Sequence, residues 1–237
     1  MSIFFGATPG RKGQFGVAAL YFKDQLPASV LRLRAVACVD DALREIIAVA
    51  GEWSEMSAVG VAAPLSWDGS ARGLRPCDHE ILERLPTWAP RPWVRSAVAL
   101  PGAVALQGPA LAWALANEIK SGQLPKHAVF ETLPRASLAL LAPEHKSDLL
   151  LLSGRPTPAA HAKAVARLLA RLTDSNIVRF DVPPPTTLFA LEAVVSALIA
   201  LAVTSPALGL VTRELDGGNL RPLGARPVVL LEALAPR

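Results

Sequence analysis

One segment near the end of the chain restricts its possible folds more than any other. The run from Leu188 to Val203 is almost wholly apolar, and Glu192 is its only charged residue. At 16 residues the run is shorter than the roughly 20 that a helix needs to span a bilayer. A helix that is apolar on all sides is buried in a protein core. We therefore expect a helix that covers a sheet, and no membrane segment.

The beginning of the chain has the pattern of three consecutive strands. Residues 3–8 and 15–22 are rich in strand-forming residues and flank a turn that contains a proline and two glycines. Residues 30–37 alternate apolar and basic side chains with a period of two, as half-buried strands do. These features predict an antiparallel meander of three strands.

The remaining residues predict helices that alternate with strands. A polar connector is expected at residues 143–156, and a turn at Gly217-Gly218. Three strands followed by alternating helices and strands predict an α/β fold in which helices cover both faces of a mixed sheet. The expected helices are 42–53, 77–85, 109–121, 134–141, 157–172 and 187–204, and the expected strands are 58–63, 128–132, 177–182, 207–213 and 227–233.

Composition limits the class of protein. A hydrophobic share of 51% excludes a disordered chain, and 237 residues are enough to bury a core. We expect one domain over residues 1–237, with an insertion rich in proline and tryptophan at about 66–103. Two cysteines cannot build a disulfide framework, and the first residues lack the pattern of a signal peptide, so we infer a cytoplasmic protein.

The charge balance is mildly basic, with a net charge of +4 and a pI of about 9.4. The basic pairs are scattered, so they suit either a solvated surface or a shared phosphate-binding face. Nucleic acid is therefore one candidate partner. The pairs are Arg11 with Lys12, Arg32 with Arg34, Arg72 with Arg75, and Arg91 with Arg95.

Five stretches resemble the motifs of a known family, in the same order along the chain. They are GATPGRKGQFGVAAL at 6–20, VGVAAPL at 59–65, RPCDHEILERL at 75–85, FETLPRASL at 130–138 and, more weakly, LEAVVSALIAL at 191–201. The family is the predicted RNase H-like nuclease family, classed as domain of unknown function 429. The resemblance implies an RNase H-like mixed sheet, with an antiparallel three-strand meander, further parallel strands, and helices on both faces.

The resemblance also implies a site for two divalent metal ions, held by carboxylates at strand ends and on the last helix. Glu131 and Asp78 match as acids, Arg75 matches as the neighbouring base, and Glu192 occupies the position on the last helix. Glu131 and Glu192 are the candidate metal ligands. The positions of two other acids are instead Ala7 and Ala62. A methyl group cannot coordinate Mg²⁺ or Mn²⁺, because these hard ions require oxygen ligands.

The alanines at positions 7 and 62, where the family has acids, leave two alternative functions. The first is a catalytically degenerate RNase H-like domain that acts as a binding or scaffold protein without a cofactor, with Trp67, Trp88 and Trp93 as exposed contacts for a protein partner. The alternative is a nuclease or phosphodiesterase that uses Mg²⁺ or Mn²⁺ bound to the remaining acids, Asp78, Glu131, Glu192 and Asp181.

The candidate residues also have purely structural interpretations. Glu131 can be a solvated residue at the end of a strand. Arg75 and Asp78 can form a surface pair on one helix, because they are three residues apart. Glu192 can lie either at a solvated edge of its helix or in a former active-site cleft.

Overall fold

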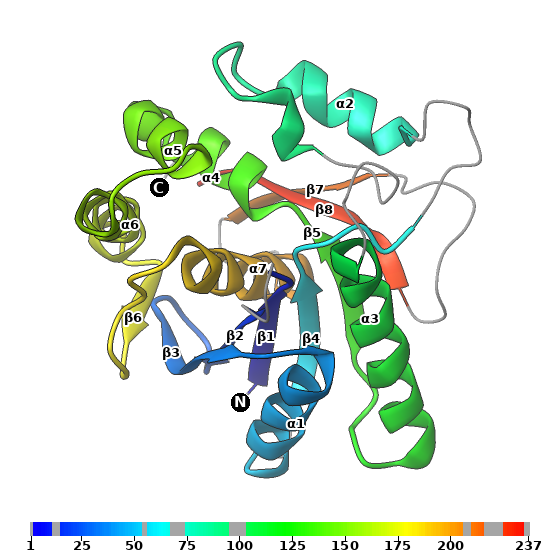
Figure 1. Cartoon of the computed structure of the whole chain (residues 1–237). Coiled ribbons are helices and arrows are strands. Elements are labelled where there is room, and N and C mark those ends of the chain that lie inside the picture. The colour runs from blue at the N-terminus through cyan, green and yellow to red at the C-terminus, as the bar shows by residue number, and fades with distance from the viewer. Residues whose placement is uncertain are drawn as a thin grey trace.

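The computed structural model describes residues 2–10, 15–53, 56–66, 74–94, 103–205, 210–215 and 225–234. Its centre is an eight-stranded sheet with the order β6-β3-β2-β1-β4-β5-β8-β7 (Figure 1). The division of the chain into domains stays a prediction. The strands are β1 (Ser2–Thr8), β2 (Phe15–Phe22), β3 (Ala28–Val36), β4 (Met56–Val61), β5 (Ala128–Thr132), β6 (Val178–Phe180), β7 (Leu210–Leu215) and β8 (Ala225–Leu234).

The strand directions confirm the predicted fold class. β1, β2 and β3 form an antiparallel meander. β4 runs parallel to β1, β5 runs parallel to β4, and β8 runs parallel to β5. β7 closes one edge antiparallel to β8, and the short β6 lies parallel to β3 at the other edge. The molecule therefore has the RNase H-like mixed sheet that the sequence predicts.

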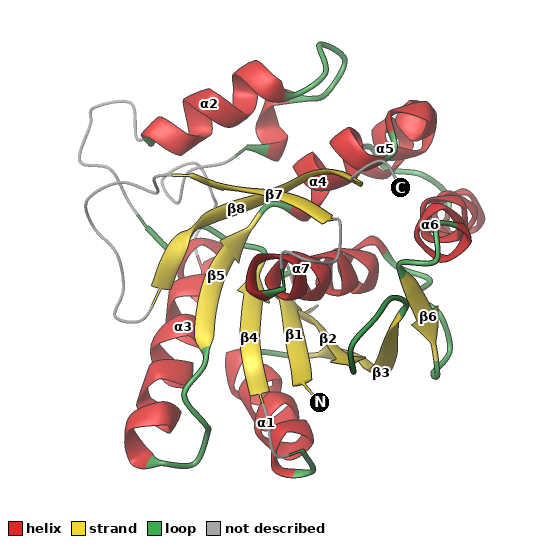
Figure 2. Cartoon of the chain, turned by 180° about the vertical axis from the view of Figure 1, so that it is seen from behind, coloured by secondary structure: helices red, strands yellow, loops and turns green. Residues whose placement is uncertain are grey.

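Helices cover both faces of this sheet. α7 crosses β1, β2 and β4 on one face, where α4, α5 and α6 also contribute to the core, and α1 and α3 cover the opposite face (Figures 1 and 2). α2 lies beside β7 and β8 (Figure 1). The helices are α1 (Val39–Gly51), α2 (Pro76–Arg84), α3 (Ala103–Ser121), α4 (Pro134–Leu141), α5 (Lys146–Ser153), α6 (Pro158–Asp174) and α7 (Leu188–Thr204), with short 3-10 turns at Arg91–Trp93 and Pro143–His145.

The long apolar segment forms the buried helix that its composition predicts. Every residue of α7 from 191 to 202 is buried. The helix lies so close to the sheet that a Cβ atom on Gly6 would overlap the carbonyl oxygen of Ala193. A Cβ atom on Gly60 would overlap the carbonyl oxygen of Ser196 in the same way. Within the described ranges, no helix has both the length and the apolar character that crossing a membrane requires.

Two predictions differ most from the structure. α3 begins at Ala103 rather than at residue 109, so that Pro109 lies inside the helix. A proline there removes one main-chain hydrogen bond, and the face that buries Leu111 and Leu115 offsets that loss. The expected polar connector at 143–156 contains α5, because its run of leucines buries Leu149 and Leu152. The turn expected at Gly217-Gly218 lies outside the described residues.

Candidate functional site

A cleft of about 330 Å³ opens where β1, β4 and β5 end. In the sheet, β2 and then β3 follow β1 on one side of the cleft, and β4 and then β5 lie on the other side. Open α/β sheets bind ligands at such switch points, beyond the carboxyl ends of their strands. The cleft is lined by Thr8, Pro9, Gly10, Ala62, Ala63, Pro64, Pro92, Trp93, Thr132, Leu133, Pro134, Arg135, Phe189 and Glu192.

The charged groups of the cleft form one ion pair. Nε of Arg135, in the first turn of α4, donates to Oε1 of Glu192 on α7. The Glu192 side chain is only 5% exposed, whereas that of Arg135 is 32% exposed. A buried carboxylate is tolerated when it has a cationic partner. Of the two interpretations of Glu192, the structure therefore supports the position in the cleft.

Two threonines, Thr132 and Thr8, also line the cleft. Oγ1 of Thr132 donates to Oγ of Ser196 on α7 at 3.0 Å. Thr8 is also buried, and its hydroxyl has no hydrogen-bond partner among the described residues. Buried polar atoms in native proteins usually have a partner, so the Thr8 hydroxyl requires an explanation.

Behind the cleft, Arg75, Asp78 and Glu131 form a fully buried network. The Nη2 and Nη1 atoms of Arg75 donate to Oε1 and Oε2 of Glu131 at 2.6 and 2.7 Å. Nε and Nη2 of Arg75 also donate to Oδ2 and Oδ1 of Asp78 at 3.1 and 2.8 Å. The backbone N–H of Leu65 donates to Glu131 at 2.7 Å. The interpretations of Glu131 as a solvated residue and of Arg75 with Asp78 as a surface pair are therefore wrong.

Burial shifts the protonation equilibria in this network. Burial raises the pKa of Glu131, and the Arg75 guanidinium opposes that rise. Burial acts to lower the pKa of Arg75, but the carboxylates of Glu131 and Asp78 outweigh it and raise the pKa, so this side chain stays charged. Burial also raises the pKa of the neighbouring Cys77 thiol well above its usual range, which makes a reactive thiolate unavailable at neutral pH.

Four of the five acid positions that the resemblance implies, all except Asp78, do not point to one place. Side chains alternate between the faces of a strand. On β5, Thr132 faces α7, whereas Glu131 points to the face that holds Leu65. Ala7 belongs to the core under α1 and α3, whereas Ala62 lines the cleft. The cleft thus receives Ala62 and Glu192, while Ala7 and Glu131 face the other side of the sheet.

The donor atoms of the cleft do not suit a pair of hard metal ions. In the described part of the chain, no three or more histidine, cysteine, aspartate or glutamate residues form a group that could hold a metal ion. Glu131 is held by Arg75, and Glu192 is paired with Arg135. A Mg²⁺ or Mn²⁺ ion requires a shell of oxygen ligands, which these residues do not supply.

The tryptophans of the insertion are less exposed than the sequence predicts. Trp93 is 8% exposed, and its Nε1 donates to Oγ of Ser153 at the end of α5 at 2.8 Å. Trp88 is partly buried and packs edge-to-face on Trp93. Trp67 lies outside the described residues. Trp88 and Trp93 attach the insertion to the core, so the expectation that Trp93 is exposed is wrong.

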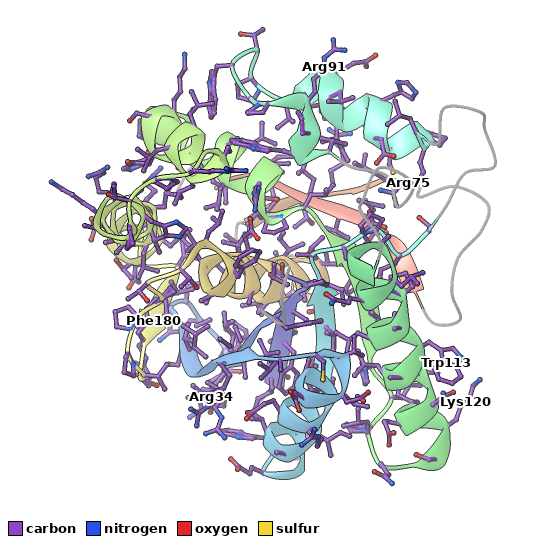
Figure 3. The ribbon with its side chains drawn as sticks, viewed as in Figure 1. Arg34, Arg75, Arg91, Trp113, Lys120 and Phe180 are labelled. Atoms are coloured by element: carbon purple, nitrogen blue, oxygen red, sulfur yellow. The ribbon has the colours of Figure 1, made fainter. Side chains whose placement is uncertain are left out.

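The described members of the basic pairs, Arg32, Arg34, Arg75 and Arg91, do not gather on one face. Arg75 is buried, and Arg32 pairs with Glu45 on α1. In Figure 3, Arg91 lies beyond α2 and Arg34 lies near α1, at opposite ends of the molecule. Arg11, Lys12, Arg72 and Arg95 lie outside the described residues.

No family model matches the chain, and no curated protein matches its sequence. The chain is similar to a solved structure described as T. thermophilus RuvC in complex with Holliday junction substrate. The identity is 14% and the TM-score 0.40, over 83% of this chain and 90% of that chain. A similarity of this size does not support a function, so the fold assignment rests on the strand order and directions.

Sequence reasoning missed three polar residues of the cleft: Thr8, Thr132 and Arg135. Arg135 gave a usable signal, because it follows Pro134 directly after a predicted strand and therefore falls in the first turn of a helix. The two threonines gave none, since threonine is common in strands for reasons unrelated to binding.

Proposed function

We propose that this chain is a catalytically degenerate relative of the RNase H-like nucleases classed as domain of unknown function 429, and that it acts as a binding or scaffold domain. One observation carries the proposal: arginines neutralise the acids that the resemblance assigns to the site. Arg135 pairs with Glu192 in the cleft, and Arg75 holds both Glu131 and Asp78 behind it.

The position of Arg135 argues against metal binding on electrostatic grounds. A guanidinium in direct contact with Glu192 repels a divalent cation at the same carboxylate, and the repulsion is strong where water is excluded. Ala62, which also lines the cleft, supplies a methyl group in place of an oxygen ligand. The cleft is therefore better suited to a ligand that accepts hydrogen bonds than to a metal ion.

The alternative function, a nuclease that recruits other acids, has less support from the geometry. Asp181 follows β6 at an edge of the sheet and lies 3.8 Å from Arg179. Strands β3, β2, β1 and β4 lie between β6 and β5, the strand that carries Glu131. Asp181 and Glu131 therefore belong to separate regions of the sheet.

A metal titration tests the proposed function. We expect isothermal titration calorimetry with millimolar MnCl₂ or MgCl₂ to show no saturable binding, because the carboxylates are already paired. We also expect no cleavage of single-stranded or double-stranded DNA or RNA with either ion present. Saturable Mn²⁺ binding, or cleavage, that disappears in Glu192→Gln and persists in Glu83→Gln would contradict the proposal. Glu83 is an exposed acid on α2 and serves as the control.

A further inference from the structure

The cleft contains an arginine that is only partly used. Arg135 donates to Glu192 through Nε, and it makes no further hydrogen bond with the described residues. Its Nη1 and Nη2 atoms form a planar pair of donors, which matches the two oxygens of a carboxylate. About a third of the side chain is exposed, and Arg135 lines the cleft, where a ligand can contact it.

Two helices begin at the same cleft. Phe189 in the first turn of α7 lines it, as do Pro134 and Arg135 in the first turn of α4. The first turn of a helix carries a partial positive charge. In α7 the N–H groups of Leu188 and Ala190 already donate to His161 and Thr187, and the first residue of α4 is a proline without an N–H group, so these ends act mainly through that charge. Such ends attract anions.

The unpartnered hydroxyl of Thr8 is independent evidence for a ligand. Thr8 is 2% exposed and lines the cleft from the end of β1. On this strand Phe5 and Ala7 face the core under α1 and α3, so Thr8 points to the α7 side, where the cleft lies. A buried hydroxyl without a partner is unfavourable, and an oxygen or nitrogen atom of a ligand would satisfy it.

The charges and walls of the cleft indicate the kind of anion. The charges of Arg135 and Glu192 cancel, which leaves the partial charges of the two helix ends, about half an elementary charge each. A single negative charge balances them better than the double charge of a phosphate group. Much of the wall is apolar, formed by Pro9, Pro64, Pro92, Trp93, Leu133 and Phe189.

We propose that the cleft binds a small organic monocarboxylate, with its carboxylate on Arg135 and its apolar body against the proline-rich walls and Trp93. The volume of about 330 Å³ lies within the range of small-molecule sites. The inference rests on the proposed function, because a pair of metal ions would occupy the same space.

Phenylacetate is a suitable first probe, with binding followed by saturation-transfer NMR and calorimetry on the full chain. We expect saturable binding of phenylacetate. The neutral analogue 2-phenylethanol should bind at least about tenfold more weakly, because it loses the charge-assisted hydrogen bonds to Arg135. Inorganic phosphate and phenyl phosphate should also bind more weakly than phenylacetate.

Two cleft variants locate the binding. Arg135→Gln keeps a donor for Glu192 but removes the guanidinium, and we expect it to weaken phenylacetate binding at least about tenfold. Ala62→Leu fills the cleft and should abolish binding. Arg44→Gln on α1 and Ala110→Leu on α3 are exposed controls that should bind as the wild type does. Thermal unfolding of each variant shows whether it is folded.

The outcomes separate the two proposals. Wild-type protein that binds neither Mn²⁺ nor phenylacetate would overturn the carboxylate site alone. Tighter binding of phenyl phosphate than of phenylacetate would also overturn the carboxylate site. So would wild-type affinity for phenylacetate in folded Arg135→Gln and Ala62→Leu. Saturable Mn²⁺ binding that depends on Glu192 would overturn the proposed function, and the carboxylate site with it.

Discussion

Arg75 connects three separate parts of the chain through a single guanidinium. It donates to Glu131 on β5, to Asp78 in the first turn of α2, and to Ser66 after β4, with Nη1 lying 3.0 Å from the Ser66 hydroxyl. All the donor atoms of the guanidinium group point toward oxygen atoms inside the protein. The arginine thereby attaches α2 to the ends of β4 and β5.

Removing this arginine should destabilise the protein strongly. Arg75→Gln leaves two buried carboxylates without a cation, and breaking a buried ion pair in this way typically costs about 3–5 kcal/mol. Urea denaturation measures the loss in the free energy of unfolding. Arg84→Gln is the matched control on the same helix. Its side chain is 34% exposed, so we expect a loss below about 1 kcal/mol. Equal losses in the two variants would contradict a structural role for the Arg75 network.

The same variant should change how stability depends on pH. Burial raises the pKa of Glu131, and Arg75→Gln removes the guanidinium that opposes the rise. A carboxyl group whose pKa is raised by folding favours the folded state at low pH, and that contribution is lost as the pH rises through the folded pKa. The free energy of unfolding of Arg75→Gln should therefore fall from about pH 5 to about pH 8 by more than that of the wild type. Parallel pH curves for the two proteins would contradict this expectation.

Single residues were the hardest features to predict from the sequence. The resemblance selects Glu131, Asp78 and Arg75 as site residues, and their catalytic role stays a prediction. It does not show that the three side chains bind one another, as they do in the structure. Whether a strand residue faces α7 or the opposite core depends on where the strand begins. A difference of one residue separates Ala7, under α1 and α3, from Thr8, in the cleft.

At the scale of elements, the contact between α7 and the sheet depends on glycines. At Gly6 and Gly60 the backbone of the helix occupies the space that a side chain would need. The atoms in the way are main-chain carbonyl oxygens, so the helix itself would have to move to make room. Backbone shifts of this kind cost typically 1–3 kcal/mol, and occasionally more.

Gly60→Ala tests this packing. We expect a loss of at least about 2 kcal/mol in the free energy of unfolding, measured by urea denaturation, because the new methyl group meets the Ser196 carbonyl. Gly51→Ala at the end of α1 is the control, since a Cβ there has open space around it. We expect that control to be neutral or more stable by up to about 1 kcal/mol. Wild-type stability in Gly60→Ala would show that the helix can move away at little cost.

Elements with a strong periodic pattern were predictable. The bounds of β2, β5 and α4 match the expected ranges, and α7 differs by one residue. The sequence does not predict α5, because its four consecutive leucines have no helical period and polar residues flank them. The start of α3 was placed late, because a proline normally marks the first turn of a helix and here lies in its interior.

At the scale of the whole molecule, element order was enough to predict the mixed sheet. It was not enough to predict the site. The cleft combines side chains from β1, β5, α4 and α7 with residues just after β4. No local pattern links Thr8, Arg135 and Glu192, because their proximity arises only when the sheet and its covering helices are assembled.

The place of α7 in the chain also determines when the molecule can become stable. Its residues lie more than 170 positions after β1, yet they cover β1, β2 and β4. β1, β2 and β4 therefore cannot bury the face that α7 covers until almost the entire chain is available to them. Contacts between such distant residues make folding slow, and a growing polypeptide exposes these apolar strands throughout most of its synthesis.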